Sequence, residues 1–313
     1  MQLLYALAEL RTPFLDALLG ALTNCGGELV FMAAAIIVFW CVSKSCGYYM
    51  LTVGFVGTIV NQFLKLVFRI PRPWVKDPDF QIVESARAEA TGYSFPSGHT
   101  QNVFASFGCL GRWTKQAWLR VVCALLIVVT AFSRMYLGVH TPLDVGVSFG
   151  IGLVLVFALY PLFRDIDSHP KRLYLLFVGM AVLGAAYLLF AEFWPFPADV
   201  DAANLASGRK NAYTLLGAVL GMTFAYWLDR RYVHFDVRAV WWAQVLKTVL
   251  GLAITIGLRA ALKAPLLALC GGHNVANLIR YALMVIFAAG IWPMTFGWFG
   301  RLGRKKPASG ASD

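Results

Sequence analysis

Three short blocks of the chain carry residue types that could hold a phosphate group and attack it. In chain order they read KLVFRIPRP at 65–73, PSGH at 96–99 and SRMYLGVHTPLD at 133–144. Together they supply three cations, two histidines, one carboxylate and a turn opened by glycine. The residues concerned are Lys65, Arg72, Pro73, Pro96, Ser97, Gly98, His99, Ser133, Arg134, His140 and Asp144. We interpret this set as an imidazole beside a phosphate-binding site.

The third block contains a histidine and a carboxylate at helical spacing. Pro142 follows His140 closely and favours the first turn of a helix. Asp144 lies four positions after His140, about one helical turn away. The carboxylate can accept a hydrogen bond from one ring nitrogen and leave the other as a nucleophile with a free lone pair. Taken alone, the pair could equally well only cap a helix.

The second block, PSGH, is typical of a helix start. Ser97 opens an apolar stretch, and Gly98 lets the backbone approach a ligand closely. The free N–H groups of a helix start favour an anion. His99 falls in that first turn, where a second imidazole could protonate a leaving oxygen. Alone, these four residues would also describe an ordinary serine-capped helix.

The three cations come from two blocks. Lys65 and Arg72 are seven residues apart, so two helical turns bring them to one face, although Pro71 and Pro73 distort that end. Arg134 is the third. An arginine fork suits phosphate oxygens and lysine adds a point charge. Snorkelling at a helix end explains Lys65 and Arg134 poorly, because both are expected near the outward side.

The composition requires these blocks to work in a membrane. Of 313 residues, 59% are hydrophobic and 14% are charged, whereas soluble domains average about 45–50% and about 25%. Backbone groups in lipid must be satisfied within helices, so we expect an all-α bundle of about nine spans. The expected stretches are 28–44, 47–68, 97–112, 117–135, 142–163, 173–194, 212–228, 242–264 and 279–298.

The basic residues are distributed as topology signals. The net charge is +11, but the cations lie in short loops and no nucleic-acid-binding signature is visible, so we expect no nucleic-acid partner. Positive loops near 111–120, 164–172 and 229–238, with the basic C-terminus, should face the cytosol. The three blocks then share the opposite side. We expect a multi-pass protein of the cell membrane whose site faces away from the cytosol.

The chain divides by composition into four parts. Residues 1–27 are expected to form an interfacial or re-entrant helix, with a true span as the alternative, and no cleaved signal peptide is expected. Residues 28–194 would form the catalytic membrane core, and 195–300 would add further transmembrane helices. A basic disordered tail is expected at 301–313, and the loop at 77–95 is expected to cover the site as a lid.

Taken jointly, the blocks resemble the phosphatidic acid phosphatase type 2 (PAP2) superfamily, whose signature is KxxxxxxRP, PSGH and SRxxxxxHxxxD. The match covers 65–144 without a departure. The resemblance implies a six-helix catalytic core, with His140 as nucleophile forming a phosphohistidine, Asp144 orienting it and His99 protonating the leaving group. It implies no metal and no cofactor. The residues implied to bind the phosphoryl oxygens are Lys65, Arg72, Ser97, Gly98 and Arg134.

The substrate stays open at this point. The leading expectation is a membrane-lipid phosphate or an isoprenyl diphosphate, hydrolysed at the outward face of the bilayer. Alternatives are a soluble phosphate ester, as in the similar glucose-6-phosphatases, and transfer of phosphate from a lipid diphosphate to an acceptor. A catalytically silent transporter or scaffold is disfavoured by the intact histidines and aspartate. Vanadium haloperoxidases share the motifs but are soluble, and a homo-oligomer is left open.

Overall fold

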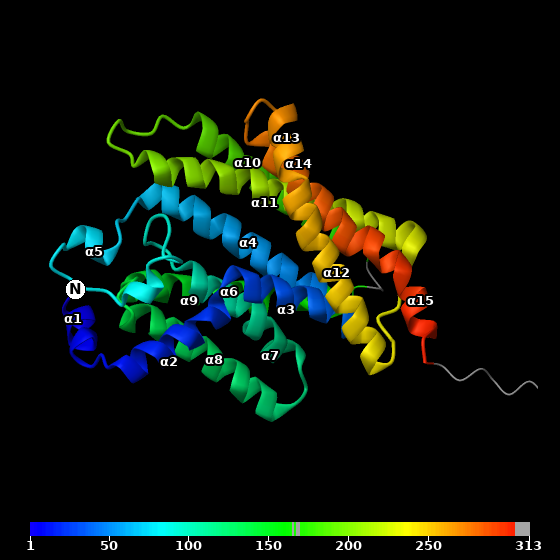
Figure 1. Ribbon diagram of the computed structural model, residues 1–313, viewed down its shortest axis with the longest axis horizontal. Helices are drawn as coiled ribbons and strands as arrows, with labels where there is room; N and C mark the ends of the chain where they lie inside the picture. Colours follow the sequence, from blue (N-terminus) through cyan, green and yellow to red (C-terminus); the bar gives the residue numbers. More distant parts are fainter. Residues whose placement is uncertain (165, 167–169, 304–313) are drawn as a thin grey trace, which may run out of the picture.

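A computed structural model describes residues 1–164, 166 and 170–303, and within them every regular element is a helix (Figure 1). The elements are α1 (Gln2–Glu9), α2 (Pro13–Thr23), η1 (Asn24–Gly26), α3 (Glu28–Cys41), α4 (Lys44–Phe68), α5 (Pro73–Lys76), η2 (Glu84–Ala86), α6 (Gly98–Val103), η3 (Phe104–Gly108), α7 (Cys109–Trp113), α8 (Ala117–Tyr136), α9 (Pro142–Arg164), α10 (Pro170–Phe193), α11 (Ala202–Leu228), η4 (Asp229–Val233), α12 (Trp241–Ala261), α13 (Lys263–Leu269), α14 (Val275–Ile286), η5 (Phe287–Ile291), η6 (Trp292–Thr295) and α15 (Phe296–Arg301). The expected all-α bundle is confirmed.

Six helical segments of the described chain are long and apolar enough to cross a membrane. They are Lys44–Lys76, Ala117–Tyr136, Pro142–Arg164, Pro170–Phe193, Trp241–Leu269 and Val275–Arg301. A seventh arises if Pro13–Gly26 and Glu28–Cys41 count as one span bent by 49°. The bent pair is either one broken span or a re-entrant loop, which are the two alternatives expected for the start of the chain.

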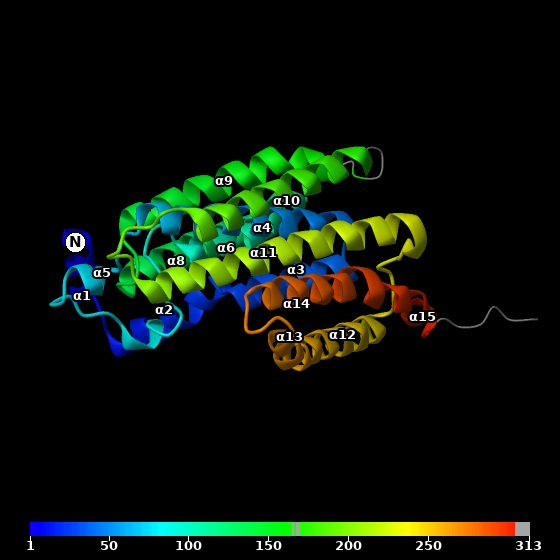
Figure 2. The same ribbon diagram turned by 90° about the horizontal axis from the view of Figure 1, so that it is seen from above.

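Two of the nine expected stretches are helical but fall outside this set. Residues 97–112 form a short rod broken into α6, the π-helical η3 and α7. The other stretch, 212–228, belongs to α11, which is 27 residues long and runs beside α4 and α10 (Figure 2). Because α11 is covered by protein on several sides, it carries more polar and small residues than a lipid-facing helix.

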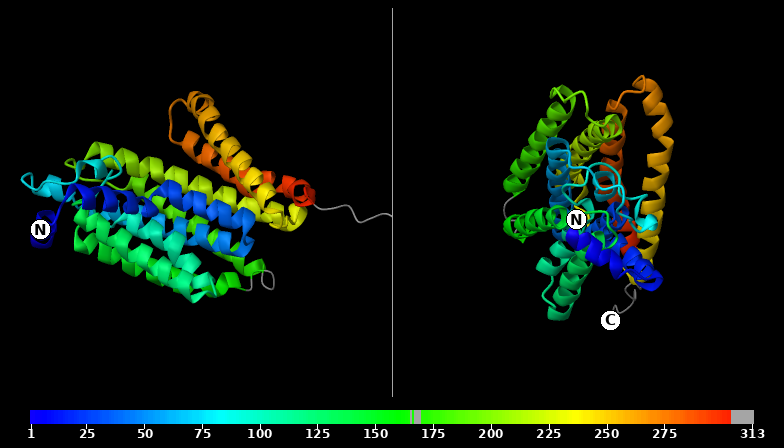
Figure 3. Two further views of the ribbon diagram at one scale, coloured as in Figure 1. Left: turned by 60° about the horizontal axis from the view of Figure 1, so that its bottom comes forward. Right: turned by 90° about the vertical axis from the view of Figure 1, so that its left-hand side faces the viewer.

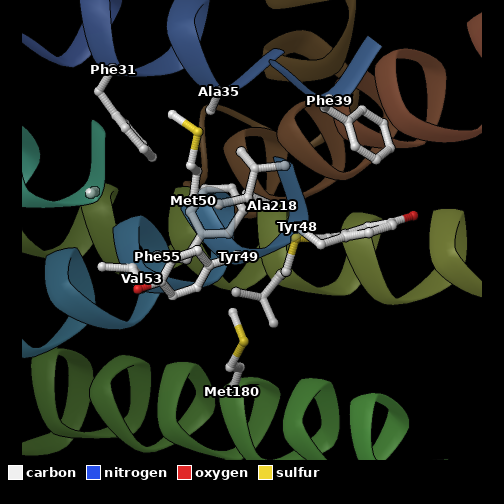
Figure 4. Packing of buried hydrophobic residues seen from close by; sticks show 14 of the residues in the cluster. Phe31, Ala35, Phe39, Tyr48, Tyr49, Met50, Val53, Phe55, Met180 and Ala218 are labelled. Carbon is white, nitrogen blue, oxygen red and sulfur yellow. The ribbon is translucent and has the colours of Figure 1, made fainter. Parts of the chain in front are cut away.

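The core lies where α3, α4, α10 and α11 meet. Phe31 and Phe39 of α3 pack with Tyr48 and Tyr49 of α4, and Met180 of α10 closes the cluster from below (Figure 4). Gly54 of α4 faces the ring of Phe31 so closely that an added Cβ would overlap it. This close approach holds α3 against α4, the helix that carries the first chemical block.

The long helices α4 and α8 to α11 run roughly along one axis and separate two ends of the molecule (Figures 1 and 3). One end holds α1, α5 and the loop 77–97. At the other end lie the turn between α7 and α8, the start of α10 and the end of α15. All three chemical blocks therefore reach one end, and the basic loops 111–120 and 229–238 reach the other. Residues 165 and 167–169 of the expected loop 164–172, and residues 304–313 of the expected tail, lie outside the described residues.

The C-terminal helices pack on the outside of α11. Helices α12 and α14 form a hairpin that crosses the bundle at an angle (Figure 3). Gly217 and Gly221 of α11 let the backbone of α14 approach, since an added Cβ there would overlap Leu278 and Ala282. At the far end, Lys44 donates two hydrogen bonds to the buried carboxylate of Asp229, at 2.8 and 3.0 Å. This ion pair ties α4 to the end of α11.

Candidate active site

The buried ring of His140 lies at the N-terminus of α9, and its Nδ1 atom is 3.5 Å from Oδ2 of Asp144. A reciprocal capping arrangement places that carboxylate. The N–H of Thr141 donates to Asp144 Oδ2 at 2.7 Å, and the N–H of Asp144 donates back to Thr141 Oγ1 at 3.3 Å. The helix-capping interpretation and the catalytic one are therefore compatible, because one carboxylate performs the cap and faces the imidazole.

A serine that no motif indicated also holds Asp144. Ser94 is fully buried, and its Oγ donates to Asp144 Oδ2 at 2.6 Å. The backbone N–H of Ser97 donates to the Asp144 carbonyl at 3.1 Å, which ties the second block to the third. The carboxylate is thus fixed by groups from two separate loops.

Arg72 determines that the second ring nitrogen of His140, Nε2, acts as a hydrogen-bond acceptor. Its Nη1 lies 2.9 Å from Nε2 of His140 and also donates to the Val139 carbonyl at 2.9 Å. A guanidinium can only donate, so Nε2 must be the acceptor and carry a lone pair. The proton of the neutral ring is then assigned to Nδ1, which faces Asp144. Nε2 is the ring atom with nucleophilic character.

The loop before PSGH is fastened by the cations of the first block. Arg72 donates through Nε to the Gly92 carbonyl at 3.0 Å and through Nη2 to the Thr91 carbonyl at 2.7 Å. The Nζ of Lys65 donates to the Tyr93 carbonyl. The stretch expected to form a lid is therefore anchored at residues 91–93 by Lys65 and Arg72.

His99 occupies the first turn of α6. Its Nε2 lies 2.9 Å from Oε2 of Glu89, a residue of the covering loop. Ser97 is the N-cap of α6, where its Oγ accepts from the N–H of Thr100 at 3.4 Å. Around Gly98 there is open space where a side chain would begin. The helix start thus presents backbone N–H groups beside a histidine that has a carboxylate partner.

Arg134 lies directly behind the nucleophile candidate. Its carbonyl accepts from the N–H of His140 at 3.2 Å, and its Nη1 donates to Thr23 Oγ1 at 2.9 Å. The buried Nε and Nη2 atoms have no hydrogen-bond partner among the described residues. Arg134 does not line the cavity, so this guanidinium places a positive charge just behind the cavity wall, near His140.

All eight predicted site residues thus lie at one end of the bundle, and five of them line one cavity of about 600 Å³. Those five are Lys65, Arg72, Gly98, His99 and His140. Ser97, Arg134 and Asp144 form the layer behind. The cavity continues from this cationic end past amide side chains to apolar walls contributed by α3, α4 and α11.

One wall comes from a helix outside the three blocks. Asn211, Thr214 and Leu215 of α11 line the cavity, and Nδ2 of Asn211 donates to Oε1 of Gln62 on α4 at 3.2 Å. Sequence reasoning assigned no site residue to this part of the chain. A polar turn in an otherwise membrane-length helix was the only signal that could have indicated it.

The electrostatic setting of His140 favours its neutral form. Burial, and then the positive charges of Arg72, Arg134 and Lys65, hold the pKa of His140 well below its ordinary value of 6.5. A neutral imidazole with its lone pair on Nε2 is therefore maintained at pH 7. No cluster of three or more histidine, cysteine, aspartate or glutamate side chains suited to a metal occurs in the described residues.

Two family models match the chain. The model described as "PAP2 superfamily" matches residues 45–168, which include all three blocks. The model described as "PAP2 superfamily phosphatase, transmembrane extension" matches residues 213–305. Together the two matched segments, 45–168 and 213–305, cover more than half of the chain.

Curated relatives include three phosphatases that are named for different lipid substrates. The undecaprenyl-diphosphatase BcrC of Bacillus subtilis is 34% identical over 34% of this chain and 52% of its own length. The phosphatidylglycerophosphatase B of the same organism is 25% identical, over 52% of this chain and 80% of its own. The mouse sphingosine-1-phosphate phosphatase 1 is 24% identical, over 62% and 47%. The chain thus spans about half of the first relative's length, and no solved structure matches it.

Proposed function

The chain belongs to the PAP2 superfamily, and from that premise we propose that it is a membrane phosphatase that hydrolyses a lipid phosphate through a phosphohistidine on His140. The observation that carries the proposal is the 2.9 Å contact between Nε2 of His140 and Nη1 of Arg72 at the head of the cavity. A phosphoryl group that replaces Nε2 as the acceptor of the Arg72 hydrogen bond would lie next to the lone pair that this exchange releases.

The first half of the reaction transfers the phosphoryl group to the enzyme. Nε2 of His140 attacks phosphorus, and the bond from phosphorus to the leaving oxygen breaks as the new P–N bond forms. His99 gives its proton to the leaving oxygen. Arg72, Arg134, Lys65 and the N–H groups at the start of α6 stabilise the charge on the phosphoryl oxygens.

The second half returns the enzyme to its starting state. The neutral His99 accepts a proton from water, whose oxygen attacks the phosphohistidine. The P–N bond breaks, inorganic phosphate leaves, and the electron pair returns to Nε2 of His140. Asp144 stabilises the positive ring during both halves, since its Oδ2 faces Nδ1 at 3.5 Å.

The shape of the cavity favours a lipid over a soluble ester. Its walls include Leu29 and Val30 at the start of α3, and Leu29 is 75% exposed on the outside of the bundle. Apolar residues that both line a cavity and face the lipid provide a lateral path for a hydrocarbon chain. A phosphate ester of a sugar would leave this wall without a partner.

The distribution of charge supports an orientation for the proposed site. The site lies at the end opposite the basic loops 111–120 and 229–238, and the preference for positive charge on the cytosolic side favours a phosphate-binding end on the outward face of the cell membrane. In sealed vesicles of known orientation, hydrolysis of a membrane-impermeant short-chain substrate reports the side of the site. Activity restricted to the cytosolic side would contradict this assignment.

The function is tested with purified protein in detergent and a substrate panel. We expect release of inorganic phosphate from long-chain lipid phosphates, with weaker hydrolysis of glucose 6-phosphate, and loss of both activities in His140→Ala. Preference for the soluble ester would reject the lipid assignment. A phosphorylated acceptor in place of free phosphate would show a phosphotransferase, and turnover that survives His140→Ala would reject the mechanism.

A further inference from the structure

Two buried amide side chains line the cavity just beyond the phosphate-binding end. Asn61 of α4 is 2% exposed and Gln101 of α6 is 1% exposed. Neither the amide oxygen nor the amide nitrogen of either residue has a hydrogen-bond partner within the described part of the chain. Leaving a buried polar group unpaired costs about 1–3 kcal/mol. Four such atoms at one place indicate a ligand-binding function.

The two amides follow Lys65 along one face of α4. Asn61 precedes Lys65 by four residues, so both side chains project from the same face, about 6 Å apart along the helix. The amide of Gln101 lies over Gly57, one further turn away, because an added Cβ at Gly57 would overlap Nε2 of Gln101. The order from the phosphate end inward is therefore Lys65, Asn61, Gln101.

The chemistry of the cavity changes along this order. Lys65 and Arg72 supply positive charge at the head. The amide level is uncharged and offers both donors and acceptors. Beyond it, Phe31, Phe55 and Leu215 supply apolar wall. A ligand that matches this sequence has a phosphate, then an uncharged polar group, then hydrocarbon.

We propose that Asn61 and Gln101 form a specificity subsite for a hydroxyl or carbonyl group a few bonds from the phosphorus of a lipid monophosphate. This inference rests on the proposed lipid phosphatase function and narrows its substrate class. A prenyl phosphate carries hydrocarbon directly after the phosphate and would leave both amides unpaired, which disfavours it. A second phosphate would require cations at this level, where the cavity has neutral amides.

The test compares two lipid monophosphates of equal chain length in detergent micelles. Lysophosphatidic acid carries a hydroxyl and an ester carbonyl near the phosphate, and the matching alkyl monophosphate carries neither. We expect the wild-type protein to prefer lysophosphatidic acid in kcat/KM by about tenfold or more. Asn61→Leu and Gln101→Met should each lower kcat/KM for lysophosphatidic acid about tenfold and change the value for the alkyl phosphate less than about twofold.

Two further variants separate recognition from folding. Gly57→Ala alters no polar group but pushes the Gln101 amide away, so it should reproduce the loss of selectivity. Thr52→Val is the matched control, since Thr52 of α4 is buried with an unpartnered hydroxyl among the described residues but lies outside the cavity lining. It should leave selectivity unchanged.

The outcomes distinguish a failure of the subsite proposal from a failure of the proposed lipid phosphatase function. Equal losses on both lipids in Asn61→Leu and Gln101→Met would assign the amides a structural role and overturn the subsite. Wild-type protein that hydrolyses both lipids equally would overturn it as well, with the lipid phosphatase function intact. Protein that cleaves only soluble esters would instead reject the proposed function and, with it, the subsite.

Discussion

The hydroxyl of Ser94 donates a 2.6 Å hydrogen bond to the carboxylate of Asp144, from a loop fifty residues earlier in the chain. The bond links the covering loop to the carboxylate that faces His140 Nδ1. Residues of the same loop line the cavity, so we expect the position of the loop to influence the orientation of His140 through Asp144.

The variant Ser94→Ala tests this link. A hydrogen bond to a charged group is worth about 1.5–3 kcal/mol, so we expect kcat/KM to fall about 10- to 100-fold. KM should change less than kcat, because Ser94 does not line the cavity. Ser85→Ala is the control, since Ser85 is an exposed serine of the same loop. Equal activity of the two variants would show that Asp144 is held without Ser94.

The pH profile reports the electrostatic state of His140. Burial and the nearby cations hold its pKa well below 6.5, so the neutral nucleophile persists as pH falls through 6.5. The acid limb of kcat/KM caused by this group should therefore lie below pH 6.5. In the unfolded chain His140 has its ordinary pKa of 6.5, so as the pH falls the unfolded chain is protonated at His140 before the folded protein is. The contribution of His140 to stability is therefore fully present above pH 6.5 and declines as pH falls below it.

Arg72→Gln tests the cause of that depression. Removing a positive charge 2.9 Å from Nε2 raises the pKa of His140, so the acid limb of the residual activity should move to higher pH. The level of kcat/KM should also fall about 100-fold or more, because a phosphate donor is lost. Arg87→Gln removes an exposed arginine of the covering loop and should leave the limb in place. An unshifted limb in Arg72→Gln would contradict the electrostatic explanation.

Glu89 provides a counter-charge for His99. Burial and the positive charge of Arg134 lower the pKa of His99 to about 4, and Glu89 acts in the opposite direction. Its Oε2 lies 2.9 Å from Nε2 of His99, so the carboxylate favours the protonated ring that the general acid requires. We expect Glu89→Gln to lower kcat about tenfold and to move the alkaline limb to lower pH. Glu84→Gln is the control, since Glu84 pairs only with Arg87 at the surface. A larger loss of kcat in Glu84→Gln than in Glu89→Gln would show that Glu89 is not the carboxylate that supports His99.

The ion pair between Lys44 and Asp229 should stabilise the packing of α4 against the end of α11. Asp229 is buried, so Lys44→Met leaves a buried carboxylate without its partner and should destabilise the protein by about 3 kcal/mol. The apparent Tm in detergent should fall, and adding Asp229→Asn should restore part of it. Arg238→Gln, which breaks an exposed pair with Asp236, should change Tm little. A fall no larger than that of Arg238→Gln would show that the pair is dispensable.

The sequence predicted the parts of the site that are encoded by spacing. His140 and Asp144 are one turn apart, and a helix start puts them side by side. The alternation of apolar stretches and basic loops correctly placed all three blocks at one end of the bundle. The expected count of about nine spans exceeds the six, or seven with the bent pair, found among the described residues, because a helix such as α11 that is enclosed by protein does not need a lipid-facing surface.

Contacts between distant segments could not be predicted in the same way. Ser94, Asn61 and Gln101 carry no motif, and their importance depends on which atoms lie opposite them in the folded protein. The participation of Asn211 requires α11 to pack against α4, and helix periodicity does not specify a partner helix. Only the folded structure shows which of these buried polar groups have hydrogen-bond partners and which line the cavity.

The central claim is that His140 carries the phosphoryl group during turnover. It is tested most directly by rapid acid-free quenching of the purified protein with a radiolabelled lipid phosphate, followed by peptide mapping. The account predicts a base-stable, acid-labile label on the peptide containing His140, formed within one turnover and absent in His140→Ala. A label on another residue, or phosphate release in which no labelled protein forms before the first turnover is complete, would contradict it.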